Sequence, residues 1–236
     1  MKVLIVIPAY NEETLIQSTV ERVVSFASKN LTVDWEVVVA DNQSTDQTAL
    51  IVQSLAAKFF QVKYLMVPVR GKGAAIRAGW NNFSADVYCF MDADLATDLA
   101  ALPALIDGLA SGYDLAVGSR YHPDSLVKRS LTRRVFSLGY RLALRLLVGL
   151  RVKDAPCGFK AINSKIKENL LPHVQNDQWF FDSELLILAA HQGYRIKEIP
   201  VIWQDPREGS DKSRVKPWSL ALAYLKHVLE LRKRLM

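Results

Sequence analysis

The segment VYCFMDAD, residues 87–94, is a short apolar run that ends in two carboxylates, Asp92 and Asp94. An apolar run of this length, bounded by polar residues, predicts a buried strand over Val87–Met91. Two carboxylates with one residue between them, just past such a strand, can bind a hard divalent cation through their oxygen atoms. Aspartate is also common in ordinary turns. The segment therefore indicates a metal site or a turn, and the neighbouring segments must decide between them.

The rest of the first half repeats this pattern of strands, with helices between them. We predict strands over Val3–Ile7, Trp35–Ala40 and Val62–Val67, and helices that begin at Asn11 as N-cap, near Gln47 and at Arg70. This alternation predicts an α/β fold, a Rossmann-like and mostly parallel sheet with helices on both faces. Ligands of such sheets bind beyond the carboxyl ends of the strands, where residues 10–13, 41–46 and 92–94 lie. We therefore expect one site there, which favours the metal interpretation.

The second half is less regular. We predict strands over Leu115–Gly118 and Ile196–Trp203, and helices over Leu131–Val148, Phe180–His191 and Trp218–Leu235. We find no internal repeat and no linker-like tract. The simplest organisation is one domain over residues 1–215, with an amphipathic helix over residues 216–236 as a C-terminal appendage.

Composition agrees with a globular enzyme, since 50% of the 236 residues are hydrophobic and 23% are charged. The N-terminal apolar run is too short for a signal peptide and is closed by Pro8. No stretch reaches the roughly 18–20 apolar residues that a spanning helix needs. The two cysteines, Cys89 and Cys157, match no metal-binding spacing and are expected to be reduced thiols. We therefore expect a cytoplasmic protein.

Positive charge is concentrated in one segment. No acidic residue lies between Asp124 and Asp154, whereas eight basic residues do, more than the formal net charge of +6: Lys128, Arg129, Arg133, Arg134, Arg141, Arg145, Arg151 and Lys153. Apolar residues between the arginines make the predicted helix basic and amphipathic, which suits an anionic membrane or an acidic groove. An ordinary solvated face is the alternative. Because the segment lacks acidic residues entirely, we favour an anionic partner.

Three other groups are candidates for binding a phosphorylated ligand. Asp41 ends a strand and could bind a nucleobase or ribose, although with Ser44 it could also build a turn, and Asp46 could cap the next helix. Lys72, in the run RGKG at residues 70–73, opens a helix and suits a diphosphate. Arg120 follows a strand and suits bidentate binding of a phosphate.

The terminal helix has two interpretations that its pattern leaves open. Apolar residues recur at helical spacing from Trp218 to Leu229, and Arg232, Lys233 and Arg234 follow. Docking on its own domain explains the apolar stripe. Anchoring at a membrane interface through tryptophan and cations explains it equally well.

Taken together, these motifs resemble family 2 glycosyltransferases with the GT-A fold, and more narrowly the polyprenyl- and dolichyl-phosphate glycosyltransferases. The resemblance covers nearly the whole chain. The motifs that carry it are IPAYNEE (7–13), DNQSTDQT (41–48), RGKG (70–73), DAD (92–94), GSRY (118–121), DAPCGFK (154–160), FDSELL (181–186), EIPV (198–201) and the loop REGSDKS (207–213). The later motifs are the more specific to lipid-phosphate acceptors.

The resemblance implies an inverting transfer of a hexose from a nucleotide sugar to a polyprenyl or dolichyl phosphate. It assigns Asp92 and Asp94 to Mg²⁺ or Mn²⁺, with Asp94, Asp154 and Arg120 as catalytic residues. The expected nucleotide-sugar contacts are Pro8, Tyr10, Glu12, Asp41, Lys72, Asp92 and Lys212. The expected contacts of the acceptor phosphate are Arg120 with Arg133 or Arg134.

Departures from the family pattern refine the expected donor. Only one carboxylate, Asp41, stands where members have an acidic pair, because Asn42 follows it. Mannosyl-type members often carry a glutamine at the position of Ala96, and Trp179 also resembles the glucosyl type. We therefore favour UDP-glucose over GDP-mannose. Many members also carry C-terminal membrane spans, whereas this sequence has no stretch apolar enough to be one. We therefore expect peripheral attachment at the inner membrane face through the amphipathic helices, or a membrane-embedded partner subunit.

Three rival functions remain. A related enzyme could use a soluble polysaccharide or glycan acceptor, which would leave the basic helix without a role. A nucleotide-sugar-binding regulator could have lost catalysis, but Asp92 and Asp94 are intact. A nucleic-acid-binding module would explain the basic segment, but no aromatic interleaving or known motif accompanies it, and we expect no nucleic-acid partner.

Overall fold

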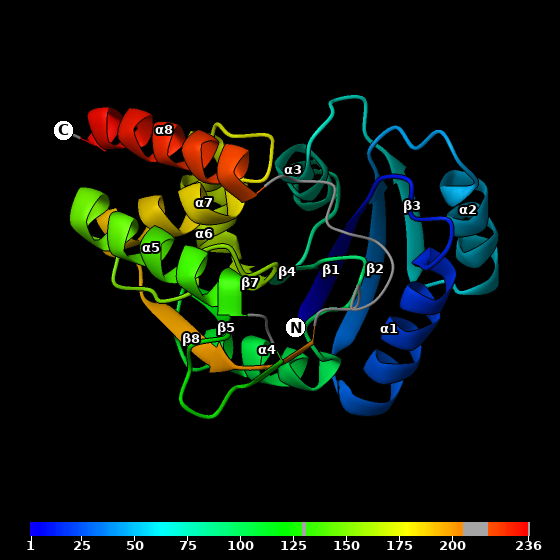
Figure 1. Cartoon of the computed structure of the whole chain (residues 1–236). Coiled ribbons are helices and arrows are strands. Elements are labelled where there is room, and N and C mark those ends of the chain that lie inside the picture. Colours follow the sequence, from blue (N-terminus) through cyan, green and yellow to red (C-terminus); the bar gives the residue numbers. More distant parts are fainter. Residues whose placement is uncertain (129–130, 205–216, 236) are drawn as a thin grey trace.

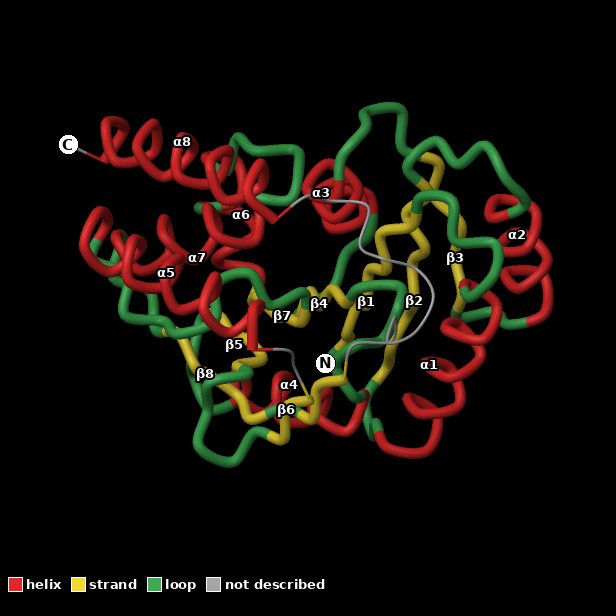
Figure 2. The backbone as a smooth tube through the Cα atoms, viewed as in Figure 1, coloured by secondary structure: helices red, strands yellow, loops and turns green. Residues whose placement is uncertain are grey.

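A mostly parallel, seven-stranded sheet forms the centre of the molecule (Figures 1 and 2). The computed structural model describes residues 1–128, 131–204 and 217–235, without the side chains of residues 131–136 and 217–222. The strand order is β3-β2-β1-β4-β7-β5-β8. Their bounds are β1 (Lys2–Ala9), β2 (Asp34–Asp41), β3 (Val62–Met66), β4 (Val87–Met91), β5 (Leu115–Ser119), β7 (Phe159–Asn163) and β8 (Ile196–Pro200). A small second sheet pairs β6 (Leu126–Lys128) with β9 (Ile202–Gln204).

The helices lie around this sheet (Figure 1). Their bounds are α1 (Ile16–Asn30), α2 (Thr48–Lys58), α3 (Lys72–Asn82), α4 (Leu102–Ala110), α5 (Leu131–Val148), α6 (Ser164–Asn169), α7 (Phe181–His191) and α8 (Pro217–Leu235), with 3-10 turns at Leu99–Ala101 and Leu171–His173. The predicted α/β class, with a mostly parallel sheet between helices, is confirmed.

Strand β1 shows why both faces of the sheet are covered. Residues 3–7 have no exposed surface, although successive side chains of a strand point to opposite faces. On one face, Gly79 of α3 lies so close to Val6 that an added Cβ would be 2.7 Å from Val6 Cγ2. Ile5 and Ile7 point to the other face and are equally buried. A continuous apolar run such as VLIVI is typical of a strand buried on both sides.

One strand runs against the others. β7 is antiparallel to both β4 and β5, between which it lies. β7 was not predicted from the sequence, and neither were β6, α4 and α6. The strand expected over Ile196–Trp203 is divided, because at Val201 the chain leaves the main sheet: its N–H donates to Ser125 Oγ at 2.9 Å, and its carbonyl accepts from Leu126. The predicted strand therefore becomes β8 and β9.

Asn11 does not cap a helix, contrary to prediction. Helix α1 begins at Ile16, and Asn11 has a positive φ of 54°. Its side chain instead accepts from the N–H of Thr45 at 2.8 Å, which ties the loop after β1 to the loop after β2. Asp46 does bind the start of α2, since its carboxylate accepts from the N–H of Thr48 at 3.0 Å.

Helix α8 docks on its own chain, against α5 and α7 (Figure 1). Its residues Val228 and Leu231 are buried, and the Tyr224 ring packs on Tyr140 and Phe180 at centroid distances of 5.4 and 5.7 Å. Docking therefore explains part of the apolar stripe. The division of the chain at residue 215 stays a prediction. Among the described residues, none of the helices has the length and apolar character needed to cross a membrane.

An ion pair fixes the end of α8. Arg234 Nη1 lies 2.6 Å from Glu184 Oε1, and Glu184 is only 2% exposed. Glu184 Oε2 also accepts the N–H groups of Gln175 and Asn176, at 3.1 and 2.7 Å. Arg234 Nη2 donates to the carbonyl of His173 at 2.8 Å. One buried carboxylate thus joins α8, α7 and the loop between α6 and α7.

We predict that Arg234→Met lowers the free energy of unfolding by about 2 kcal/mol, because Glu184 would lose its charged partner while remaining buried. Urea denaturation followed by circular dichroism measures the change. Lys233→Met, at the neighbouring exposed position, is the matched control and should stay within about 0.5 kcal/mol of the parent. Equal midpoints for Arg234→Met and the parent would contradict the prediction.

Candidate functional site

The loops after β1 and β2 form one side of the candidate site. The N–H of Asn42 donates to the Ala9 carbonyl at 2.8 Å, and the N–H of Glu12 donates to Thr48 Oγ1 at 2.9 Å. Tyr10 is exposed at this edge, and the Arg70 guanidinium lies 5.9 Å from the centre of its ring. The carboxyl ends of the strands therefore bring Pro8, Tyr10, Glu12 and Asp41 to one region, as the sequence predicts.

Asp41 is almost fully buried at the end of β2. Its carboxylate accepts the N–H of Ser44 at 3.1 Å and the hydroxyl of Tyr64 at 3.0 Å. Burial and the neighbouring Asp41 raise the pKa of Tyr64 to about 12, so the hydroxyl remains a donor at neutral pH. Asp41 therefore has a turn-forming role, and its expected contact with the nucleotide stays a prediction.

The loop before α3 is held by close backbone packing. Gly71 has a φ of 140°, and an added Cβ would lie 2.0 Å from the carbonyl oxygen of Asp177. The Gly71 N–H donates to the side chain of Asn42, and Gln178 Nε2 donates to the Arg70 carbonyl at 2.8 Å. Glycine is required here both for its backbone conformation and for the close approach. The result is a fixed start of α3, from which the Lys72 side chain extends.

Lys72 belongs to a row of buried charges. Its Nζ lies 2.7 Å from Asp92 Oδ1 and 2.9 Å from Asp182 Oδ2, and Asp182 Oδ1 lies 2.8 Å from Lys160 Nζ. Burial opposes the charge on Lys72, but Asp182 and Asp92 outweigh it and raise the Lys72 pKa. Burial likewise opposes ionisation of Asp182, but the two lysines hold its pKa below the usual range. The row connects α3, β4, α7 and β7.

The two strand-end carboxylates border a small cavity of about 110 Å³. Its lining includes Asp92, Asp94, Arg120, Gly158 and Trp203. An added Cβ at Gly158 would lie 1.9 Å from Asp92 Oδ2, so this glycine makes room for the carboxylate. Asp94 Oδ1 accepts the N–H of Ala96 at 3.1 Å. Asp92 and Asp94 thus meet at one cavity, as predicted.

The residues at this cavity fit a divalent cation that takes only one or two ligands from the protein and the others from substrate phosphates and water. Within the described part of the chain, no group of three or more His, Cys, Asp and Glu side chains is placed to hold a metal. Mg²⁺ is commonly bound by one or two carboxylates, with substrate phosphates and water completing its shell. The space that Gly158 leaves beside Asp92 suits such an arrangement.

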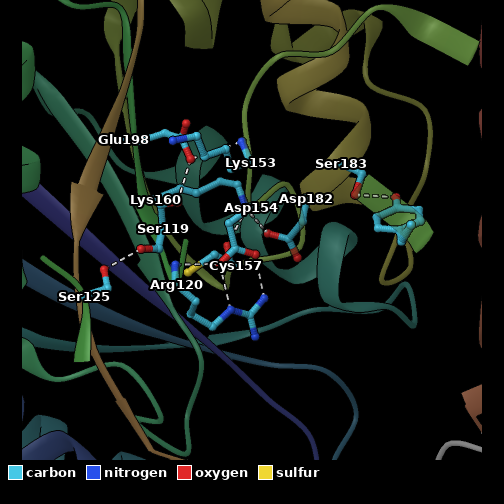
Figure 3. A network of polar contacts seen from close by, with 11 residues as sticks. Ser119, Arg120, Ser125, Lys153, Asp154, Cys157, Lys160, Asp182, Ser183 and Glu198 are labelled. Carbon is cyan, nitrogen blue, oxygen red and sulfur yellow. Dashed lines mark hydrogen bonds and ion pairs between the residues drawn. The ribbon is translucent and has the colours of Figure 1, made fainter. Parts of the chain in front are cut away.

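Arg120 lines the same cavity and forms a bidentate ion pair with the buried Asp154 behind it (Figure 3). Arg120 Nε and Nη2 donate to the two Asp154 oxygens at 2.7 Å each, and the Arg120 N–H donates at 2.8 Å. Asp154 is fully buried, which opposes ionisation, but Arg120 outweighs this and holds its pKa below the usual range. Asp154 therefore stays ionised and orients Arg120, whose guanidinium lies 5.4 Å from the centre of the Trp203 ring.

Some expected site residues cannot be placed. Lys212 and the side chains of Arg133 and Arg134 lie outside the described residues. Conversely, Lys160 and Asp182 were given no role from the sequence, although both motifs were noted. A usable signal was present, because each charged residue directly follows a phenylalanine, and buried charges are usually paired.

Gly158→Ala tests how tightly the cavity is built. We predict a loss of about 1–3 kcal/mol in the free energy of unfolding, because the new methyl group would displace Asp92. Gly139→Ala on α5 is the control: nothing lies within 4 Å of its added Cβ, so it should be neutral or stabilising by up to about 1 kcal/mol. Thermal unfolding of both variants measures the change. Equal unfolding temperatures for Gly158→Ala and Gly139→Ala would contradict the close packing of Gly158 against Asp92.

Comparisons with known proteins agree with this geometry. The family model described as glycosyl transferase family 2 matches residues 4–171. Glycosyltransferase AglD of Haloferax volcanii is 36% identical over 207 residues, which cover 86% of this chain and 33% of that protein. The dolichyl-phosphate beta-glucosyltransferase of Saccharomyces cerevisiae is 32% identical over 222 residues, covering 85% of this chain and 66% of that protein. The chain thus spans between a third and about two thirds of the length of these two relatives.

Solved structures show the same fold. Glucosyl-3-phosphoglycerate synthase from Mycobacterium tuberculosis, in complex with Mn²⁺, UDP and glucosyl-3-phosphoglycerate, superposes with a TM-score of 0.68 at 22% identity. The match covers 97% of this chain and 77% of that one. The expected GT-A arrangement is thereby confirmed. Because the family model matches most of the chain and the relatives share about a third of its aligned residues, the chain belongs to glycosyl transferase family 2.

Proposed function

We propose that this chain transfers a hexose, with inversion, from a nucleotide sugar to a polyprenyl or dolichyl phosphate. The observation that carries the proposal is the cavity in which two strand-end carboxylates face a buried arginine. The carboxylates suit the metal-bound diphosphate of a donor, and the arginine suits the phosphate of an acceptor. Relatives named dolichyl-phosphate beta-glucosyltransferases support this choice of acceptor.

The chemistry asks little of a general base. A phosphate monoester has a second pKa of about 6 and is largely dianionic at neutral pH. Its oxygen attacks the anomeric carbon while the bond to the diphosphate breaks, and the electron pair leaves with the nucleotide. Asp154 is not needed as a general base in this scheme, because Arg120 keeps it ionised and donates to both of its carboxylate oxygens. Arg120 binds the acceptor phosphate, and Asp154 fixes the orientation of Arg120.

The donor side uses the loops at the strand ends. Tyr10 is exposed and can stack on a nucleobase, Pro8, Glu12 and Asp41 supply further nucleotide contacts from the same strand ends, and Lys72 and Lys212 supply positive charge to the diphosphate. Mg²⁺ or Mn²⁺ held by Asp92 and Asp94 would stabilise the charge that develops on the leaving group. UDP-glucose is preferred over GDP-mannose. Ala96 and Trp179 support this preference, as do solved neighbours in complex with UDP-glucose.

The acceptor reaches the site from a membrane surface. Helix α5 exposes Leu138, Leu142 and Leu146, which recur every four residues and so share one side. Helix α8, packed beside α5, exposes Leu225 and Leu229. An amphipathic face of this kind, with basic neighbours, suits the interface of an anionic leaflet.

Arg141 links this face to the site. It belongs to α5, and its guanidinium lies 5.1 Å from the centre of the Tyr121 ring. Tyr121 directly follows Arg120 in the chain. A lipid phosphate at the surface of α5 would therefore be close to Arg120. We propose peripheral binding at the cytoplasmic face, directly or through a membrane-embedded partner subunit.

Product formation tests the reaction. With Mg²⁺ or Mn²⁺ and a polyprenyl phosphate, we expect UDP-glucose to yield a glucolipid and GDP-mannose to yield less or none. Asp94→Ala should reduce the rate at least about 100-fold, because it weakens stabilisation of the leaving group. Asp107→Ala, at an exposed position on α4, should leave the rate unchanged. Absence of glycolipid from both donors, with folded protein, would favour a soluble acceptor or a regulatory role.

Liposome flotation tests the membrane face. We expect the parent to bind anionic liposomes and not duplex DNA at the same ionic strength. The double variant Leu138→Glu/Leu142→Glu should weaken liposome binding by roughly tenfold or more, since it replaces two exposed leucines that would enter the lipid surface with carboxylates that an anionic leaflet repels. Leu50→Glu changes an equally exposed leucine on α2 and is the control. Unchanged liposome binding of the double variant would show that this face of α5 is not the membrane-binding surface.

A further inference from the structure

Lys72 occupies an enclosed position between two aspartates. Only 7% of its side chain is exposed, and its Nζ lies 5.3 Å from the centre of the Phe90 ring and 5.4 Å from that of Trp179. Both of its carboxylate partners lie within 3 Å: Asp92 Oδ1 at 2.7 Å and Asp182 Oδ2 at 2.9 Å. A lysine buried in this way keeps its charge only while it remains paired. Its ammonium group is therefore held next to Asp92 by the two carboxylates.

Asp182 cannot neutralise Lys72 alone, because it also pairs with Lys160. Lys160 is fully buried, lies 2.8 Å from Asp182 Oδ1, and also donates to the carbonyl of Cys157. Two lysines and one aspartate leave one positive charge in excess. Asp92 balances that charge, since its Oδ1 is the remaining carboxylate oxygen next to Lys72. One of the two strand-end carboxylates thus already holds a cation that belongs to the protein.

We propose that Lys72 is an internal counter-ion that keeps Asp92 from binding a divalent metal until a nucleoside diphosphate arrives. An ammonium group and a metal ion compete for the same carboxylate, and they repel each other at this distance. The diphosphate offers Lys72 a replacement partner, so that Asp92 becomes free to bind the metal. Metal and donor therefore enter together. This proposal rests on the proposed function and adds a role for Lys72 beyond binding the donor.

The surroundings of Lys72 allow this exchange of partners. Its backbone is fixed by the packing of Gly71 against Asp177, whereas its side chain has four flexible carbons. Asp92 is 37% exposed in its side chain, so an incoming ligand can reach it. Asp182 and Lys160 stay buried and retain each other when the Lys72 ammonium turns toward a diphosphate. They are positioning residues that keep the ammonium charged and directed toward Asp92.

Mn²⁺ binding tests the proposal without any turnover. The free Mn²⁺ signal in electron paramagnetic resonance is titrated with the parent and with Lys72→Met, with and without UDP. We expect Lys72→Met to bind Mn²⁺ alone about tenfold more tightly, because a neighbouring cation shifts carboxylate equilibria by at least that factor. At saturating Mn²⁺, the same variant should bind UDP about tenfold more weakly, because the diphosphate loses its ammonium partner. A merely structural lysine would weaken both equilibria.

The controls separate the possible failures. Lys167→Met removes a lysine that lies near Tyr88 and should leave both equilibria unchanged. Lys72→Met should fold, because Asp182 keeps Lys160 as its partner and the Asp92 side chain is 37% exposed to solvent; circular dichroism checks this. The proposal is overturned if folded Lys72→Met binds Mn²⁺ alone no more tightly than the parent. It is also overturned if the parent itself binds Mn²⁺ equally well with and without UDP. A parent that binds no Mn²⁺ even with UDP would instead reject the proposed donor site.

Discussion

The ion pairs between Lys160, Asp182 and Lys72 hold the site together, because they join elements that are far apart in the sequence. Lys160 comes from the antiparallel strand β7, Asp182 from the first turn of α7, and Lys72 from the first turn of α3. Burying three charges is favourable only if each has partners at good distances. The fold supplies them by placing β7 next to β4, with Lys160 opposite Phe90. The position of Asp92 depends on this arrangement.

The same strand explains why the two sides of the reaction meet. The segment before β7 contributes Gly158, which makes room for Asp92, and Asp154, which orients Arg120. One short run, DAPCGFK, therefore positions both the carboxylate proposed for the donor side and the arginine proposed for the acceptor side. Their charges are opposite, so the cavity between them can hold two anionic groups only when additional cations enter. This electrostatic constraint favours a metal ion that arrives with its diphosphate.

The sequence was sufficient for the first half of the fold, because β1 to β4 are continuous apolar runs separated by helices at regular spacing. The sequence did not predict β7. Its five residues include a buried lysine and come soon after Pro156 and Gly158, so the segment does not have the apolar pattern of a strand. Asn11 failed for a similar reason: its local signal suits a helix cap, but a partner 34 residues away, Thr45, takes its side chain. Contacts made only in three dimensions decided both positions.

The docking of α8 connects the side proposed to face the membrane with the proposed donor side through one carboxylate. Glu184 binds Arg234 of α8 and also the backbone N–H groups of Gln175 and Asn176. The next residues of that loop contact α3 directly, since the Asp177 carbonyl accepts the N–H of Ala74 at 3.0 Å and lies against Gly71. Because α3 begins with Lys72, which pairs with Asp92, a continuous series of contacts joins α8 to Asp92. The exposed leucines of α5 and α8, which we propose face the membrane, therefore lie on helices that are joined by contacts to the proposed donor site.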